Sequence, residues 1–345
     1  MMNKSSKSFA WIALLLIVAL LTVGCGTNTK APTTSNSSGS SNSGVSAKLK
    51  VALILPGPIN DNGWDAVAYQ GLQNAQKDLG VDIAYRESVA PSDFESAFRS
   101  YAQQKYDLII GHGNQFNDAA KAVAKDFPNT KFIVTSSNIS QAPNLGSINV
   151  LSYQVGYLGG IVAAYTTKTK KVAFIGGQEI PPIIDGGNGF VEGVKSVDPT
   201  IQVMKTNTGS FDDVAKAKET AKAFIQQGAD VVLGDANQAG LGVIDAAKGA
   251  GVFAIGYGGD QSNIAPQTVI ASGLQIYPNA IPAIVKVVQN GKFEPKFYPM
   301  GVKEDAVGLA FNPALKSKLA AGAEDKINQV ITDMKSGKNT VGIPK

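Results

Sequence analysis

The short segments that follow predicted strands of this chain are rich in Gly, Asn, Gln and Asp, and several of them contain one aromatic residue. Amide and carboxylate side chains suit a neutral polar ligand with hydrogen-bond donors and acceptors, while aromatic rings suit a flat ring or a sugar face. In an open parallel sheet, ligands bind beyond the carboxyl ends of the strands. We therefore expect a ligand site built from these segments: 56–64, 111–116, 136–138, 176–181, 206–211, 234–238 and 256–261.

The sequence gives little support for catalysis. His112 is the only histidine, so a paired-histidine metal site cannot form. There is no Gly-x-Ser-x-Gly nucleophile motif and no Walker motif, and the glycines at 256–259 lack dinucleotide-binding spacing. We interpret His112, between Gly111 and Gly113, as a strand-end residue that lines a cleft or packs. The prediction is a protein that is not an enzyme, with no cofactor and no metal.

Strands and helices alternate from Leu49 onward, which is typical of a parallel sheet with helices on both faces. The run Leu49–Leu55 is almost continuously apolar, as expected of a strand covered on both sides. Ser92 and Glu95 have the spacing of a capping box at a helix start. The first unit contains predicted strands at 49–55, 81–85, 107–110 and 131–135, and predicted helices at 64–79, 92–104 and 117–125.

The same alternation restarts near residue 172, which predicts a second α/β unit joined to the first through 153–166. Pro278 predicts the start of another helix at Tyr277, because proline is favoured in the first helical turn. The second unit contains predicted strands at 172–175, 201–205, 230–233 and 252–257, and predicted helices at 187–196, 210–227 and 239–248. A mixed tail follows, with a final helix near 324–334.

Composition and charge exclude several classes of protein. Apolar residues make up 44% of the 345 residues and charged residues 17%, which is typical of a globular chain. The net charge of +4 is spread thinly, and no basic stripe predicts a nucleic-acid partner. The single cysteine excludes an intramolecular disulfide.

That cysteine, Cys25, ends an N-terminal segment with the features of an export signal. Lys4 and Lys7 precede a short apolar run, 9–23, which is shorter than a membrane span. A lone cysteine after a small residue resembles a bacterial lipoprotein site, which implies cleavage after residue 24 and acylation of Cys25. An ordinary signal peptide with an incidental cysteine is the alternative. Residues 25–48 are mostly Gly, Ser, Thr, Asn and Ala, which predicts a flexible tether.

An ordered series of segments resembles the basic membrane protein (BMP) family of purine-nucleoside receptor lipoproteins. The first of them, Asp61–Gly71, has the family's pattern of Asp, two residues, an aromatic residue and a helix that ends in Gly. No single segment is decisive, but their order along the chain is specific. The others are 132–134, 154–160, 172–177, 209–213, 240–245 and 254–261.

The resemblance implies a two-lobe fold of the type I periplasmic-binding-protein kind, in which each lobe is a parallel sheet flanked by helices. On this basis lobe 1 comprises residues 49–153 plus about 276–295, and lobe 2 comprises 166–273 plus part of the C-terminal tail. The family members deliver a ligand to an ABC importer. We therefore expect a monomer that works with an ABC permease outside the cytoplasmic membrane, anchored there by lipid, with a Gram-positive surface as the preferred setting.

The resemblance also implies roles for particular residues. Trp64 stands where the family has a ring stacked on the purine, Phe211 resembles the opposite ring from the other lobe, and Asp61 matches the carboxylate that binds the base edge. Each residue has a structural alternative: Trp64 could be a core residue, and Phe211 could be a hydrophobic staple onto its own helix. Asp61 could be a helix N-cap. The candidate set is completed by Asn60, Asn114, Phe116, Asn237, Gly258, Asp260 and Gln275.

Two of these positions depart from the family pattern. Gly258 stands where the family often has an aspartate, and Gln275 where it often has a lysine; in the nucleoside receptors those residues hold ribose hydroxyls. Losing them removes charged hydrogen bonds worth about 1.5–3 kcal/mol each. We therefore hypothesise a free nucleobase or another flat heterocycle as the ligand, in preference to a nucleoside.

The sequence thus predicts a lipid-anchored substrate-binding protein of an ABC importer that binds a purine-type ligand between two lobes. A surface lipoprotein that senses a ligand without transport, and a sugar-binding protein of the same fold, remain as alternatives. An envelope enzyme would need to turn over its ligand. A LacI-like regulator is disfavoured, because the leader exports the chain and no N-terminal pair of DNA-reading helices is present.

Overall fold

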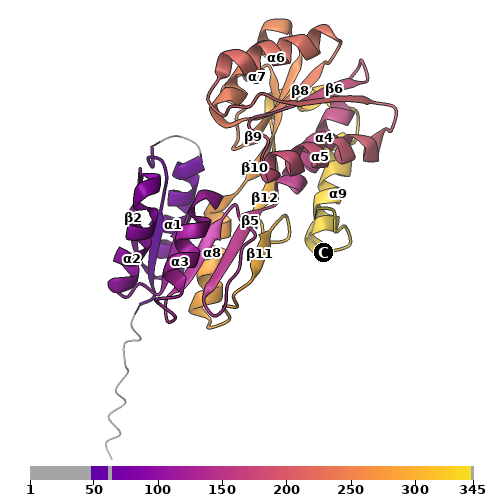
Figure 1. Ribbon diagram of the computed structural model, residues 1–345. Coiled ribbons are helices and arrows are strands. Elements are labelled where there is room, and N and C mark those ends of the chain that lie inside the picture. Colours follow the sequence, from indigo (N-terminus) through magenta and orange to yellow (C-terminus); the bar gives the residue numbers. More distant parts are fainter. Residues whose placement is uncertain (1–47, 61–63, 343–345) are drawn as a thin grey trace, which may run out of the picture. The chain divides into compact units, whose positions relative to one another are not determined.

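The computed structural model describes residues 48–60 and 64–342, and these residues form two six-stranded sheets (Figure 1). Sheet A has the order β11-β5-β4-β3-β1-β2 and sheet B the order β12-β10-β9-β8-β6-β7. Every pairing in sheet A is parallel, and in sheet B only β12 runs antiparallel, against β10. The two-domain parallel α/β fold expected from the sequence is confirmed.

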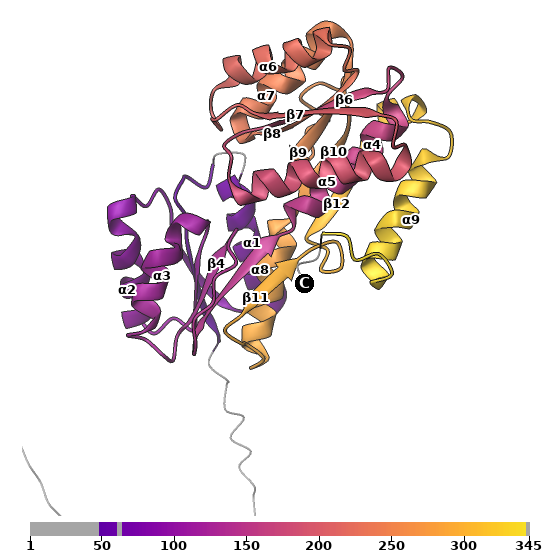
Figure 2. The same cartoon turned by 45° about the vertical axis from the view of Figure 1, so that its right-hand side comes forward.

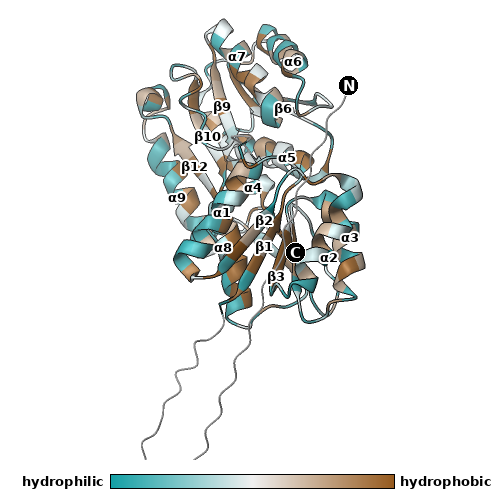
Figure 3. Cartoon of the chain, turned by 90° about the vertical axis from the view of Figure 1, so that its left-hand side faces the viewer, coloured by the Kyte–Doolittle hydropathy of each residue, from teal (hydrophilic) through white to brown (hydrophobic). Residues whose placement is uncertain are grey.

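Sheet A is covered on both faces by helices. Its strands are β1 (Lys50–Ile54), β2 (Asp82–Arg86), β3 (Leu108–Gly111), β4 (Lys131–Thr135), β5 (Leu145–Val150) and β11 (Phe297–Met300). Alternate residues of β1 point to opposite cores: Leu53 packs with α1 (Trp64–Leu79) and α8 (Tyr277–Gln289), while Ile54 packs with α2 (Phe94–Gln103) and α3 (Asn117–Ala124). Figure 3 shows β1 and β3 as hydrophobic strands between these layers.

Sheet B is built in the same way, as Figure 2 shows. Its strands are β6 (Lys171–Gly176), β7 (Gln202–Asn207), β8 (Val231–Asp235), β9 (Phe253–Gly258), β10 (Val269–Gln275) and β12 (Val307–Phe311). One face packs on α4 (Ser152–Thr166) and α5 (Pro181–Val197), and the other on α6 (Val214–Gln226) and α7 (Gly240–Ala250). The last helix, α9 (Ala323–Ser336), contacts α4.

Four short 3-10 turns complete the described elements: η1 (Pro91–Asp93), η2 (Asn114–Phe116), η3 (Asn237–Ala239) and η4 (Pro313–Lys318). The chain passes between the two sets of elements after β5, after β10 and after β11. Among the described residues, no helix is both long and apolar enough to cross a membrane.

Helices α4 and α5 pack at unusually close range because glycines line their contact. A Cβ atom added to Gly156 would lie 1.9 Å from the carbonyl oxygen of Gly186, and one added to Gly160 would lie 2.2 Å from that of Phe190. From the other side, a Cβ at Gly189 would lie 2.0 Å from the carbonyl oxygen of Tyr153. Real Cβ atoms do not approach backbone this closely, so the contact requires glycine. The segment expected to join two units is therefore a helix of the sheet B core.

Several local expectations are corrected by the structure. The capping box at Ser92 is wrong: the N-cap of α2 is Asp93, whose side chain makes no capping hydrogen bond, because η1 precedes the helix. Helix α6 begins at Val214 instead of at residue 210, since the Asp213 carboxylate accepts from the Lys216 amide at 2.9 Å and caps it there. Strands β5, β10, β11 and β12 were not expected from the sequence.

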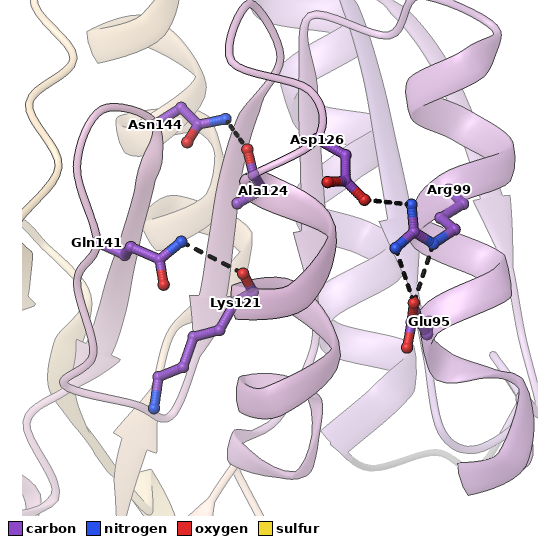
Figure 4. Close-up of polar contacts among 7 residues, drawn as sticks. All are labelled: Glu95, Arg99, Lys121, Ala124, Asp126, Gln141 and Asn144. Atoms are coloured by element: carbon purple, nitrogen blue, oxygen red, sulfur yellow. Dashed lines mark hydrogen bonds and ion pairs between the residues drawn. The ribbon is translucent and has the colours of Figure 1, made fainter.

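Polar contacts tie the helices of sheet A to its loops (Figure 4). Arg99 of α2 contacts Glu95 one turn earlier and also donates to Asp126, beyond the end of α3, at 2.7 Å. The buried Asn144 amide donates to the carbonyl oxygens of Ala124, Phe127 and Thr130 at 2.8–3.0 Å. The Asn144 amide thus satisfies the carbonyl group of Ala124, the last residue of α3, and two carbonyl groups of the loop that follows the helix.

Candidate functional site

Trp64, the first residue of α1, is held against His112 at the end of β3. The two ring centroids are 3.8 Å apart with the planes tilted by 31°. His112 is fully buried, and its Nε2 lies 3.2 Å from the carbonyl oxygen of Trp64. Because a carbonyl only accepts, Nε2 carries a proton, and Nδ1 accepts from the Thr135 hydroxyl at 2.8 Å. His112 is thus a packing residue, one of the two roles expected for it.

Tyr277 fixes the same indole from a second direction. It opens α8 and is almost fully buried; its ring stands edge-on to both Trp64, at 6.5 Å, and His112, at 5.0 Å. Burial raises the pKa of its hydroxyl, and hydrogen bonds with the side chains of Ser136 and Trp64 oppose that rise. The hydroxyl lies 2.8 Å from Ser136 Oγ. Trp64 itself remains only partly buried, so His112 covers one face of a ring whose orientation is fixed.

Phe211 occupies a comparable position at the carboxyl end of sheet B. It follows β7, is partly buried, and lies against Gly177 just beyond β6. A Cβ at Gly177 would lie 2.4 Å from Phe211 Cδ1, so the ring rests directly on the glycine backbone. The carbonyl oxygen of Phe211 accepts from the Ala239 amide at 2.8 Å, which ties this loop to η3. Trp64 and Phe211 are not in ring contact with each other among the described residues, and each stands with its own sheet.

The polar candidates lie at the same strand ends and are exposed. Asn60 follows β1, Asn114 opens η2 after β3, and Asn237 opens η3 after β8. Asp260 follows β9, and its Oδ1 accepts from the Ser262 amide at 2.9 Å. Their side chains are available to a ligand at the carboxyl edges, where such sites form in parallel sheets.

Phe116 is the candidate that the structure removes from the set. Its side chain is fully buried in the core between sheet A and α2, with ring centroids 4.0 Å from Phe94 and 5.9 Å from Phe98. The aromatic position after β3 turns inward because η2 begins a helical turn there, which directs the ring under α2. The sequence pattern of one aromatic residue in a loop does not distinguish this case from Trp64. Two other candidates, Asp61 and Cys25, lie outside the described residues.

The two positions that depart from the family pattern lie at the ends of β9 and β10. Gly258 has φ +91°, a conformation that side chains rarely adopt, and a Cβ there would meet no atom within 4 Å. Gln275 donates from Nε2 to the Ser152 hydroxyl at the start of α4, at 3.1 Å. Both positions are neutral, so neither supplies a charge at this edge of sheet B.

Asp235, which ends β8, and Tyr257, near the end of β9, lie in the expected segments 234–238 and 256–261, but sequence reasoning did not single them out. Asp235 is 5% exposed. Burial raises the pKa of its carboxyl to about 8, and the nearby Tyr257 hydroxyl acts in the opposite direction. Burial and the Asp235 charge raise the pKa of Tyr257. An aspartate directly after a run of buried strand residues is the signal that could have indicated this pair.

A surface depression of about 880 Å³ lies elsewhere, on the side of sheet A that carries α2 and α3. Glu95 and Asp118 stand on its rim, and Phe94 and Gln115 line it. Trp64 and His112 do not line it, so it is separate from the ring cluster. Among the described residues, no cluster of three or more His, Cys, Asp or Glu side chains could hold a metal ion.

Comparison with known proteins decides the family. The sequence profile of the Bmp family, described as "ABC transporter substrate-binding protein PnrA-like", matches residues 48–340. The chain belongs to this family. The resemblance seen in the sequence is therefore confirmed, and the family consists of solute-binding proteins rather than enzymes.

The individual relatives are named either for ligand binding or for transcriptional activation. The chain is 30% identical over 320 residues to the ABC transporter nucleoside-binding protein BmpA of Lactococcus lactis, covering 86% of this chain and 90% of that protein. It is 29% identical to a purine-binding protein of Brucella abortus, covering 76% and 75%. It is also 31% identical to the transcriptional activator protein med of Bacillus subtilis, covering 71% and 76%.

A solved structure agrees with the fold. The crystal structure of a transcriptional activator of the comK gene from Bacillus halodurans superposes with a TM-score of 0.74 at 25% identity, covering 84% of this chain and 99% of that one. The chain is thus similar both to proteins named for transport or binding and to proteins named for regulation.

Proposed function

We propose that this protein binds a purine-type ligand between the ring of Trp64 and the ring of Phe211 and delivers it to an ABC permease. The observation that supports the proposal is the way each ring is held. His112 and Tyr277 fix the indole, and the backbone of Gly177 supports the phenyl ring, while both rings stay partly exposed. Rigid, half-open rings at strand ends suit stacking on a planar base.

The polar edge of the ligand would meet Asp61, with Asn60, Asn114 and Asn237 as further contacts. A carboxylate suits ring N–H and amino donors, since hydrogen bonds to a charged group are strong and directional. The exposure of the three asparagines is consistent with this role. The nucleoside-binding and purine-binding relatives support the ligand class.

The ligand is proposed to be a nucleobase in preference to a nucleoside. Gly258 and Gln275 supply no charge for ribose hydroxyls, and the amide of Gln275 is already bonded to Ser152. Calorimetry with adenine, guanine, xanthine and the matching nucleosides tests this directly. Nucleosides that bind at least as tightly as the bases would show the ribose argument to be wrong.

Membrane anchoring through Cys25 belongs to the same proposal. Cleavage after residue 24 would leave Cys25 as the acylated first residue, followed by the tether 25–48 and the folded body. Replacing Cys25 by serine is expected to release the protein from the membrane fraction and to abolish labelling by palmitate. Retention and labelling of the serine variant would exclude Cys25 as the anchor. A monomeric folded body of two lobes is part of this proposal, with α4 assigned to lobe 2 and β11 to lobe 1.

Ligand sensing without transport is a second candidate, favoured by the relatives whose names describe transcriptional activators. The ring pair would serve either role. Uptake of a radiolabelled base by cells with and without the gene distinguishes them: a sensor leaves the uptake rate unchanged, and an importer component does not. Competition with glucose and galactose in the binding assay tests the sugar-binding alternative.

A further inference from the structure

Asp235 and Tyr257 form a buried polar pair that the proposed stacking site does not use. Asp235 ends β8 and Tyr257 lies one residue before the end of β9, on the face of sheet B covered by α4 and α5. Asp235 Oδ2 and the Tyr257 hydroxyl oxygen are both shielded from solvent, and neither has a geometric hydrogen-bond partner among the described residues. A buried polar atom without a partner costs free energy, so the pair calls for an explanation.

Gly186 of α5 makes room for this pair. A Cβ atom at residue 186 would lie 2.8 Å from Asp235 Oδ2 and 3.3 Å from the Tyr257 hydroxyl oxygen. Both oxygens therefore lie close to the same point of the α5 backbone. The absence of a side chain at Gly186 lets the carboxyl and the hydroxyl share one enclosed space.

Among the described residues, no positively charged group acts on the Asp235 carboxyl. Its β6 neighbour in the sheet is Gly176 and its α5 neighbour is Gly186, and neither has a side chain. Tyr257 from β9 is the titratable group that acts on it. Asp185, next to Gly186, is exposed and acts electrostatically on Tyr153. A carboxyl enclosed in this way stays neutral near pH 7, because burial disfavours the charged form.

Tyr257 as a whole is more exposed to solvent than its hydroxyl group. The residue is only partly buried although the hydroxyl is enclosed. The next two residues are Gly258 and Gly259, and a Cβ at either one would meet no atom within 4 Å. Tyr257 thus lies at the carboxyl edge of β9 and is partly exposed, while its hydroxyl is turned into the protein.

We propose that Tyr257 presents its ring to the ligand from sheet B and that the protonated Asp235 carboxyl holds the ring in place through its hydroxyl. The inference rests on the proposed function, because it adds a ring to the same purine site. Tyr257 is the ligand-contacting residue and Asp235 is a positioning residue. The ligand portion beside Gly258 is then planar or apolar, since a ring and two glycines offer it no charge.

The test measures adenine affinity between pH 6 and pH 9.5 for wild type, Tyr257→Ala, Tyr257→Phe and Asp235→Asn. Asn replaces the neutral acid with a side chain of equal size that cannot ionise. Wild-type affinity is expected to fall above about pH 8, approaching tenfold per pH unit, because an ionised Asp235 no longer keeps its place beside Gly186. Asp235→Asn is expected to bind with the same affinity across this range.

Tyr257→Ala is expected to weaken adenine binding at least tenfold at pH 7. Tyr257→Phe is expected to bind adenine with an affinity between those of Tyr257→Ala and wild type. The affinity of Tyr257→Phe should not decline at alkaline pH. Asp245→Asn, which changes an exposed aspartate of α7, is the matched control and should follow the wild-type profile. Tyr257→Ala with wild-type affinity, or a decline shared by wild type and Asp235→Asn, overturns the proposal.

Infrared spectroscopy separates this proposal from the proposed function. A protonated carboxyl band at pH 7 that is absent from Asp235→Asn supports the pairing, and no such difference overturns it, whether or not any ligand is present. If wild type binds none of the purines at any pH, the proposed function fails and the ligand role of Tyr257 fails with it. The band then still decides whether Asp235 is the protonated partner.

Discussion

The indole of Trp64 illustrates how single residues prepare a binding surface. His112 covers one of its faces, so a ligand has access to the opposite face alone. His112 is itself held by the Trp64 carbonyl and by Thr135, which leaves little freedom for the ring pair. Such preorganisation reduces the ordering cost of binding.

The first prediction separates stacking from positioning at this site. Trp64→Ala is expected to weaken adenine binding by about 1–3 kcal/mol, as for other base-stacking rings. His112→Ala is expected to cost about 0.5–1.5 kcal/mol, because it removes the supporting ring and not the ligand contact. Apart from Trp11 in the leader, Trp64 is the only tryptophan of the chain, so its fluorescence after removal of residues 1–24 reports this ring alone.

A double-mutant cycle checks the dependence of one ring on the other. If His112 acts through Trp64, His112→Ala adds little to the loss already caused by Trp64→Ala. Fully additive losses would mean that His112 acts on the ligand independently. The emission maximum of His112→Ala should also shift, since the indole loses its partner.

The second prediction concerns the two neutral positions of sheet B. Gly258→Asp with Gln275→Lys should lower the dissociation constant for guanosine relative to guanine at least tenfold, because each charge adds a hydrogen bond worth about 1.5–3 kcal/mol. The side chain at residue 258, where φ is +91°, costs about 1–2 kcal/mol of folding stability, which is the same for the free and the bound protein. Calorimetry gives the ratio of the two constants. Gln226→Lys, on the exposed surface of α6, is the control for an added lysine away from the site, and an equal change there would sink the prediction.

At the scale of elements, the contact between α4 and α5 depends on glycine. Gly160→Ala is the third prediction: it is expected to destabilise the protein by at least about 1–3 kcal/mol, because the new methyl group meets the Phe190 backbone, which cannot rotate away. Urea denaturation measures the loss. Gly249→Ala in α7 is the control, because nothing lies within 4 Å of its added Cβ.

The control should be neutral or stabilising by up to about 1 kcal/mol, since alanine favours a helix more than glycine does. A Gly160→Ala protein as stable as Gly249→Ala would show that the two helices move apart freely. Because Gly186 belongs to the same contact, loss of this packing would also disturb the space around Asp235.

The sequence predicts most elements of this fold, and the exceptions have physical causes. Helix α4 is apolar on nearly all sides, because it is buried by α5, sheet B and α9 together, so it shows no helical face in the pattern. The sequence predicts α5 only from residue 187, because two prolines and two glycines at 181–187 argue against a helix locally, whereas the helix begins at Pro181. Strands β11 and β12 pair only after long separations along the chain, which no local pattern reveals.

The placement of the candidate residues was predicted well where it depends on strand ends and poorly where it depends on side-chain direction. Trp64, Phe211 and the asparagines lie at carboxyl edges, as expected from the alternation of strands and helices. Phe116 turns into the core, and Asp235 and Tyr257 were not singled out within their expected segments, because the direction of a residue at a strand end depends on which helix covers it. Gly186 is 49 residues before Asp235, beyond the reach of local reasoning.

At the scale of the whole molecule, Asp235 makes stability depend on pH. Its pKa is about 8 in the folded protein and near 3.8 when unfolded, so the folded state binds more protons between these values. The fourth prediction follows: the free energy of unfolding decreases as pH rises from about 4 to about 8, by up to about 1.4 kcal/mol per pH unit from this group. Asp235→Asn should lack this decline, whereas Asp245→Asn should retain it.

Denaturant unfolding at pH 5, 6, 7 and 8 measures the difference between wild type and Asp235→Asn. Other carboxyl groups contribute equally to both proteins, so the difference isolates residue 235. A constant difference across the four pH values would mean that Asp235 is ionised in the folded protein, contrary to its enclosure beside Gly186 and Tyr257.

The fifth prediction concerns the two halves of the chain together. Trp64 stands with sheet A and Phe211 with sheet B, and three crossings of the chain join the two sets of elements. If one ligand contacts both rings, as we propose, it shifts the population toward the arrangement in which both contacts are made, by its extra affinity for that arrangement. Adenine is therefore expected to reduce the radius of gyration of wild type in small-angle scattering, and to leave that of Phe211→Ala nearly unchanged even at saturation. Equal contraction of both proteins would mean that the ligand is held by sheet A alone, and that closure depends on contacts other than the second ring.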